Sequence, residues 1–343
     1  MKVVFADEQL LHDPQTFFSS GALTPHPEKP ERATRLLAAA KEAGLERQAP
    51  GELGLEYAFD LHSERYLEYL QNIYPRWARI DGGSDEVVPG IHPDPRSGGY
   101  PASAAGQAGV HMQDLSCPIG AHTWTGVIWS AHSAAQAAAN VLSGDAACYA
   151  LSRPPGHHAT RDYAAGFCYL GNTAIAAQAL REKHARVAVI DVDVHHGNGT
   201  QDLFYNRGDV LTVSLHADPV RFFPFHWGYA SEVGEDEGEG ANLNVPLPRG
   251  TADDDYLHAL DETLCQVTDF APEAVVIALG LDAHESDPFQ GFRITTAGFG
   301  RIAELLGELR LPTVLVQEGG YLSAELGDNL RAFLEGFRSA HGS

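Results

Sequence analysis

The segment RVAVIDVDVHHGNGT, residues 186–200, carries an apolar run that leads directly into a cluster of polar side chains. Residues 187–190 are continuously apolar, which predicts a strand buried on both faces. In an extended chain, alternate side chains point to the same side, so Asp191, Asp193 and His195 share one face. The segment therefore predicts a buried strand that delivers two carboxylates and an imidazole to its carboxyl end.

Four further apolar runs extend this strand into a sheet. They lie at 148–151, 210–215, 274–279 and 313–316, with helical stretches such as 173–184 and 253–269 between them. This alternation predicts an α/β fold with an open, mostly parallel sheet and helices on both faces. The apolar start MKVVF predicts a first strand, and residues 27–44 predict a loop leading into a helix that ends at Gly44.

The 343 residues contain no internal repeat and no low-complexity linker, so we expect a single domain, 1–343. Residues 80–125 are rich in Gly, Pro, Ser and Ala and only weakly periodic, which predicts a long loop. Such a loop could line an active-site entrance, form an oligomer contact or be an ordinary surface loop.

A metal site is expected where the strands end. Asp282 follows the apolar run at 274–279, and ligands of parallel sheets bind outside the carboxyl ends of the strands. Asp193, His195 and Asp282 would give three protein ligands and leave a position for water or substrate, as in catalytic zinc sites. The oxygen-rich set also suits Fe²⁺ or Co²⁺.

Groups for acid–base chemistry follow two other strands. SRPPGHHAT, residues 152–160, holds His157 and His158 on a backbone that two prolines and a glycine constrain. Asp191 and Asn198 are candidate partners, a carboxylate for one imidazole and an amide for the other, which would make the two histidines unequally basic. In LVQEGGY, residues 315–321, Tyr321 could donate a hydrogen bond to a developing oxyanion.

The overall composition narrows the class of partner. The formal charge is −23, from 46 acidic and 23 basic residues, which opposes nucleic-acid binding and favours small cationic molecules or basic peptides. No apolar run is long enough to span a bilayer. Four cysteines without a CxxC pair suit a reducing cytoplasm.

The motifs together resemble the histone deacetylase and acetylpolyamine amidohydrolase family. The matching text runs in family order as HPEKPERATRL, LHSERYLEYL, RPPGHHAT, GFCYLGN, IDVDVHHGNGTQDLFY, SLHADP, GLDAHESDPF and QEGGY, from about residue 26 to 321. The resemblance implies an arginase-like fold and zinc on Asp193, His195 and Asp282. It implies a zinc-dependent hydrolase that removes acetyl or another short acyl group from a linear amine.

The resemblance also assigns roles to individual residues. His158 would be the general base and acid, His157 would assist electrostatically, and Tyr321 would polarise the scissile carbonyl. Phe167, Phe223 and Gly166 would line a channel for the linear arm of the substrate. Structural K⁺ would be expected in two places, one near Asp191, Asp193, His195, Ser214 and Leu215, and one near Phe204, Arg207 and Val210.

The identity of the amine stays open at this point. In acetylpolyamine enzymes, residues 80–125 correspond to a loop that builds a dimer and carries two glutamates toward the substrate, where this chain has Ala105 and Ser116. An amidase for a small neutral or xenobiotic amide is therefore an alternative.

Two other classes compete with the deacetylase hypothesis. A binuclear ureohydrolase of the same fold would need further carboxylates where Gly197 and His284 stand. A non-enzymatic binder predicts the loss of a catalytic group, and none is missing from the sequence.

Overall fold

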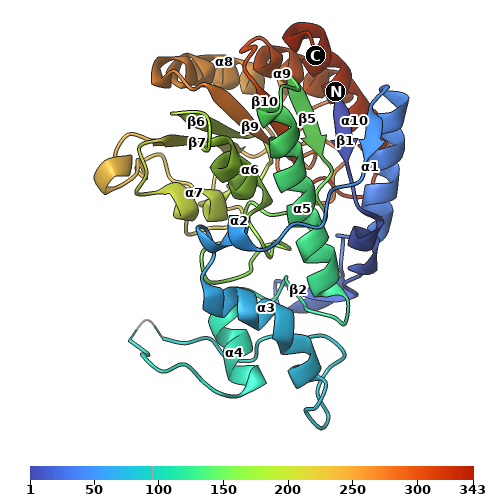
Figure 1. Ribbon diagram of the computed structural model, residues 1–343, viewed down its shortest axis with the longest axis vertical. Helices are drawn as coiled ribbons and strands as arrows, with labels where there is room; N and C mark the ends of the chain where they lie inside the picture. Colours follow the sequence, from blue (N-terminus) through green and yellow to red (C-terminus); the bar gives the residue numbers. More distant parts are fainter. Residues whose placement is uncertain (95) are drawn as a thin grey trace.

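A parallel sheet of eight strands forms the centre of the protein in this computed structural model, which describes residues 1–94 and 96–343 (Figure 1). In spatial order the strands are β4 (Glu46–Gln48), β1 (Lys2–Val4), β5 (Ala147–Ala150), β10 (Thr313–Gln317), β9 (Ala274–Leu279), β6 (Val187–Asp191), β7 (Val210–Ala217) and β8 (Asn242–Leu247). All neighbouring pairs run parallel, so their carboxyl ends meet at one edge. The predicted α/β class with an open parallel sheet is confirmed.

Helices cover both faces of this sheet, as continuous apolar strands require. In β6, Ala188 and Ile190 pack into one hydrophobic cluster, whereas Val187 and Val189 pack into another. The first cluster includes residues of α1 (Pro30–Glu42), α8 (Asp253–Phe270), α9 (Thr296–Gly307) and α10 (Leu326–His341). The second includes residues of α3 (Glu64–Trp77), α4 (Ala104–His111), α5 (Thr123–Leu142), α6 (Asn172–Leu180) and α7 (Asn198–Phe204).

Local sequence signals explain where several helices begin and end. Proline starts α1, where its missing N–H costs nothing, and Gly44 follows the helix in the left-handed region at φ +82°. Three aspartates occupy the first turn of α8 and complement the helix dipole. The helix predicted at 173–184 ends at Leu180, with its last four residues in a turn instead.

The segment 80–125 departs from the prediction of a wholly irregular loop. It contains α4 and the first three residues of α5, and an isolated β-bridge joins Val87 to Ile119. In Figure 1, α3 and α4 lie together at the end of the molecule farthest from α8 and α9. The weak periodicity of an alanine- and glycine-rich helix concealed α4 from sequence analysis.

Smaller elements complete the chain. The short strands β2 (Thr16–Ser19) and β3 (Ala22–Pro25) form an antiparallel hairpin outside the main sheet. The remaining short helices are η1 (Asp7–Leu11), α2 (Glu56–Phe59) and η2 (Asp236–Gly238). Among the described residues, no helix combines the length and the apolar character that crossing a bilayer requires.

Candidate active site

Asp193, His195 and Asp282 come together at the carboxyl ends of β6 and β9. The His195 Nδ1 atom lies 3.1 Å from Asp193 Oδ1 and 3.1 Å from Asp282 Oδ2, and one ligand atom from each residue lies within 4.8 Å of the others. All three side chains are buried. This cluster is compact enough for one ion to contact all three residues.

Backbone amides hold the carboxylates in place. The amide of Gly319 donates to Asp193 Oδ2 at 2.8 Å, and that of Val194 donates to Asp282 Oδ1 at 3.1 Å. Burial opposes protonation of His195, but its hydrogen bonds to both carboxylates outweigh burial and raise its pKa to about 9. Buried carboxylates that attract a proton this strongly also suit a divalent cation, which would displace that proton.

A second buried group of metal-ligating types consists of His157, Cys168 and Glu318. Here the Glu318 carboxylate already accepts hydrogen bonds from the amides of Gly156 and His157 and from the Thr173 hydroxyl, at 2.6, 3.0 and 2.6 Å. Burial raises the pKa of the Cys168 thiol well above its ordinary value, so the thiolate that metals bind is disfavoured. This second group is better explained as a hydrogen-bonded support than as a metal site.

The two tandem histidines have different partners. His157 Nδ1 lies 2.9 Å from Asp191 Oδ2, and His158 Nδ1 lies 2.7 Å from Asn198 Oδ1. Because both partner atoms are acceptors, each Nδ1 carries the hydrogen, and the Nε2 atom of a neutral His158 is left as a free acceptor. The two predicted partners thus bind different histidines, Asp191 to His157 and Asn198 to His158.

This division makes one imidazole cationic and the other neutral. Burial lowers the pKa of His157, but the nearby carboxylates of Asp191 and Asp193 outweigh it and raise that pKa to about 10. Burial and the charges of His157 and His195 lower the pKa of His158 well below its ordinary value. At neutral pH, His158 can therefore accept a proton beside a protonated His157.

Tyr321 is contacted by groups from two other parts of the chain. Its amide donates to Asp287 Oδ2 at 3.0 Å, and the Arg32 guanidinium lies 5.1 Å from the centre of its ring. Burial raises the pKa of Tyr321 well above its ordinary value, so the phenol stays protonated. It can then donate a hydrogen bond but cannot act as a base.

These groups meet at a cavity of about 730 Å³ that opens at the carboxyl edge of the sheet. Phe167, Phe223 and Gly166 line it together with both histidines and Tyr321. The Phe223 ring meets His158 edge to face at 5.0 Å, and the Phe167 ring meets Tyr321 edge to face at 5.8 Å. The predicted channel residues therefore stand beside the reactive groups.

Residues 26–337 match the histone deacetylase domain. The chain belongs to the histone deacetylase family. Among its relatives, an acetylpolyamine amidohydrolase of Burkholderia pseudomallei (strain 1710b) is 46% identical over 343 residues and 100% of each chain. An acetylpolyamine amidohydrolase of Mycoplana ramosa is 38% identical and covers 98% of this chain and 99% of its own. The resemblance inferred from the motifs is confirmed.

Solved structures agree with this assignment. The crystal structure of an acetylpolyamine aminohydrolase from Burkholderia pseudomallei matches with a TM-score of 0.96 at 45% identity over 99% of each chain. The HDA15 HD domain matches with a TM-score of 0.80 at 27% identity, over 99% of this chain and 89% of that one. The chain is a hydrolytic deacetylase with the fold of these enzymes.

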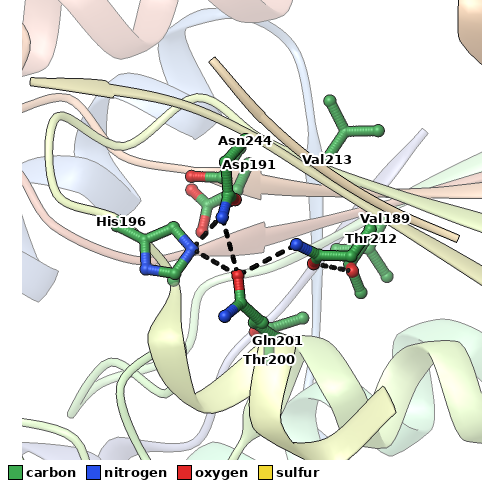
Figure 2. Close-up of a pocket in the computed structure, with 11 residues that line it drawn as sticks. Val189, Asp191, His196, Thr200, Gln201, Thr212, Val213 and Asn244 are labelled. Atoms are coloured by element: carbon green, nitrogen blue, oxygen red, sulfur yellow. Dashed lines mark hydrogen bonds between the residues drawn. The ribbon is translucent and has the colours of Figure 1, made fainter. Parts of the chain in front are cut away.

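A second, much smaller cavity adjoins the candidate catalytic groups of this deacetylase. It measures about 10 Å³, enough for one water or ion, and lies between α7 and strands β6, β7 and β8 (Figure 2). Asp191 and Ser214 line it, two of the residues predicted near potassium.

His196 and Thr200, which line this cavity, each have a buried polar atom without a hydrogen-bond partner among the described residues. His196 Nε2 lies 3.0 Å from Gln201 Oε1 and 3.1 Å from Asn244 Oδ1, so Nε2 carries the hydrogen. Its buried Nδ1 atom has no hydrogen-bond partner among the described residues, and neither has the buried Thr200 Oγ1. Asp191, Thr200 and Ser214, all with side-chain oxygen atoms, line a cavity with room for one small particle, which fits a monovalent cation or a water molecule.

The other residues predicted near potassium lie close by in the sequence. Leu215 follows Ser214 in β7. Phe204, Arg207 and Val210 lie along the connection from α7 to β7, where the Arg207 amide donates to the Phe204 carbonyl at 2.9 Å.

The family resemblance singled out Ala105 and Ser116 as loop positions that bear on substrate specificity. The structure places these two residues differently. Ser116 lines the large cavity, where its hydroxyl donates to Asp114 Oδ1 at 2.6 Å. Ala105 lies in α4 and is not among the residues that line the cavity. Neither position carries a negative charge.

Several supporting residues of this deacetylase were not identified from the sequence. Buried Arg32 donates to the carbonyls of Glu318 and Gly320 and forms an ion pair with Glu28 at 2.9 Å, which ties α1 to the loop before Tyr321. Asp287 lies five residues after Asp282, and its carboxylate also accepts from the Phe289 amide at 2.9 Å. The available signal was that Arg32 lies four residues before Leu36 and so shares the buried face of α1, but its partners are distant in sequence.

Proposed function

We propose that this chain removes acetyl or another short acyl group from a linear amine, such as an acetylpolyamine or acetyl-lysine, with one zinc ion held by Asp193, His195 and Asp282. The observation that carries the proposal is that His195 of this triad, a neutral and a charged histidine, and a protonated tyrosine all line one aromatic cavity. The names of the full-length relatives support the acetylpolyamine class. Fe²⁺ or Co²⁺ in place of zinc would suit the same ligands.

The residues divide the chemistry between them. A bound zinc ion would supply Lewis acidity, which lowers the pKa of water to about 7 and polarises a carbonyl. His158 accepts the proton of the attacking water at Nε2 and later returns it to the leaving amine. His157, held protonated by Asp191, stabilises the negative charge that develops, and Tyr321 donates a hydrogen bond to the carbonyl oxygen.

The cavity wall fits a linear substrate arm. Gly166 has φ +53°, and a Cβ atom there would lie 2.3 Å from His158 Cδ2. Glycine thus lets the backbone pass close to the base, while Phe167 and Phe223 exclude water from an apolar arm.

We further propose that potassium binds near Asp191 and Ser214, because the small cavity of Figure 2 and its unpartnered polar atoms lie there. We also propose the second potassium site, near Phe204, Arg207 and Val210, and a cytoplasmic location. Free thiols at all four cysteines are compatible with a reducing compartment. We also propose a homodimer through residues 80–125, where the side chains of Ile80, Ile91 and Tyr100 are exposed.

An amidase for a small neutral or xenobiotic amide is the second candidate, because Ala105 and Ser116 provide no charge for an ammonium group. A binuclear ureohydrolase is less well supported. A Cβ atom at Gly197 would lie 2.3 Å from Asp191 Oδ2, and the His284 ring stacks on Phe299.

Kinetics of the zinc-loaded protein test the proposal directly. We expect hydrolysis of acetylputrescine, acetylspermidine or an acetyl-lysine peptide, and its loss in His158→Ala and Tyr321→Phe. Turnover of a neutral anilide alone would favour the second candidate. Turnover of none of these amides would contradict both.

A further inference from the structure

Apart from the catalytic groups, the wall of the large cavity carries few ionisable side chains. They are Asp114, Arg221, His226 and Arg249. The wall thus has one carboxylate against two guanidinium groups, although the chain as a whole has a formal charge of −23. At physiological ionic strength, interactions between exposed charges more than about 8 Å apart are largely screened, so most of the acidic surface of the chain acts only weakly on an exposed group at the cavity.

The carboxylate of Asp114 already accepts hydrogen bonds from other residues of the protein. Asp114 Oδ1 accepts from the amide and the hydroxyl of Ser116 at 2.9 and 2.6 Å, and Oδ2 accepts from the Gly166 amide at 2.9 Å. Burial also raises the pKa of Asp114, which weakens it further as a partner for an ammonium group. Asp114 therefore holds the cavity wall beside Gly166 in place, and its carboxylate has little capacity left to bind a cationic substrate end.

The guanidinium groups of Arg221 and Arg249, in contrast, are free to bind a substrate. Both arginines are exposed, and neither forms an ion pair with any described residue. The Arg249 Nε atom donates to the Gln290 carbonyl at 2.9 Å, which leaves the rest of its planar donor group free.

The fold brings the two arginines to one side of the cavity. Arg221 follows β7 and Arg249 follows β8, and these strands are parallel neighbours. The Asp218 amide donates to the Leu247 carbonyl at 2.9 Å, so the two loops stay together beyond the strands. Guanidinium groups on two neighbouring loops of one cavity wall are a suitable partner for a carboxylate, because each can donate paired hydrogen bonds to it.

We propose that Arg221 and Arg249 select substrates whose linear arm ends in a carboxylate, so that ω-(acylamino)carboxylates are better substrates than acylated diamines of the same length. This inference rests on the proposed amide hydrolysis and specifies its substrate class. The scissile amide lies among the catalytic groups, the arm lies along Phe167 and Phe223, and the terminal carboxylate meets the arginines. A terminal ammonium group in the same place meets repulsion.

Three amides with the same tetramethylene arm test the proposal on the zinc-loaded enzyme. They are 5-acetamidopentanoate, N-butylacetamide and N-acetylputrescine, with anionic, neutral and cationic ends. We expect kcat/KM to fall in that order, with a difference of about tenfold between the ends of the series, the size expected for two partly exposed charge contacts. Added salt should reduce the difference.

Variants assign the effect to the two side chains. Arg221→Gln with Arg249→Gln should lower kcat/KM for 5-acetamidopentanoate, mainly through KM, and raise it for N-acetylputrescine. Arg301→Gln removes an equally exposed arginine that pairs with Asp254 on α8, and it should change neither value. Opposite changes for two substrates cannot arise from a general loss of folding.

The outcomes separate this inference from the proposed function. Preference for N-acetylputrescine, unchanged in the double variant, would overturn the inference while leaving amide hydrolysis intact. If none of the three amides is hydrolysed and the acetyl-lysine peptide is not either, the proposed function itself fails.

Discussion

The proposed difference in catalytic role between His157 and His158 depends on one residue, Asp191. The Asp191 carboxylate is the principal group that keeps His157 protonated, and that charge helps to hold the pKa of His158 low. His158 must be neutral to accept a proton, so activity should be lost only as pH falls well below 6.5.

Asp191→Asn should therefore change the pH profile as well as the rate. Without the carboxylate, the pKa of His157 falls, His157 becomes neutral, and the pKa of His158 rises toward its ordinary value. The acidic limb of kcat/KM should move to higher pH, and kcat should fall by about tenfold to a hundredfold, as for other residues that orient catalytic groups. Asp209→Asn, which removes a carboxylate paired with Arg181 and Arg207 away from the site, is the matched control.

Gly166 offers a second test at the scale of one residue. In Gly166→Ala, the new Cβ atom meets the His158 ring at 2.3 Å in a left-handed backbone conformation. We expect a loss of about 1–3 kcal/mol of unfolding free energy and at least a tenfold loss of turnover. Gly120→Ala, whose Cβ atom would lie 3.8 Å from its closest neighbour, should leave both unchanged.

At the scale of elements, Glu318 joins the ends of two neighbouring strands. It follows β10, and its carboxylate accepts from the backbone of Gly156 and His157, beyond β5, and from Thr173 in α6. The two backbone amides can only donate, whereas the Thr173 hydroxyl can also accept, so Glu318→Gln replaces charge-assisted hydrogen bonds with weaker neutral ones and makes Thr173 accept instead of donate. This variant should lose about 1–3 kcal/mol in chemical unfolding, and kcat should fall because the histidine loop shifts. Unaltered stability and rate would show that this loop is held by other contacts.

The same elements show what sequence could and could not predict. Continuous apolar runs located five central strands to within about two residues, because burial on both faces leaves no room for polar side chains. The polar residues directly after those strands then had to share one edge, which is why the grouping of Asp193, His195 and Asp282 could be predicted from the sequence.

The periodicity of apolar residues could not predict contacts between side chains that are far apart in the sequence. The contacts of Arg32 with Glu318 and Gly320 join residues almost 290 positions apart. The short edge strands β4 and β8 carry polar residues and lack the apolar run that marks a buried strand. Arg221 and Arg249 reach one cavity only because β7 and β8 are neighbours, which sequence order alone does not establish.

At the scale of the whole molecule, the segment 80–125 predicts assembly into a dimer. Three large apolar side chains of this segment are exposed, Ile91 at 71%, Tyr100 at 41% and Ile80 at 40%, and a dimer contact through the segment would remove them from water. Ile91→Asp should convert a dimer to a monomer in light scattering coupled to size-exclusion chromatography. Val233→Asp, at another exposed apolar position, should leave the mass unchanged. A wild-type protein that is already monomeric would refute the predicted contact.

The central claim is that one metal ion bound by Asp193, His195 and Asp282 is required for amide hydrolysis. The most direct test removes metal from the purified protein with a chelator, measures hydrolysis of an acetylated amine, and titrates zinc back while the bound metal is counted. We predict that activity disappears on chelation and returns in proportion to zinc, reaching its maximum at one catalytic ion per chain. Full activity in protein free of transition metal, or a requirement for two catalytic ions per chain, would contradict this account.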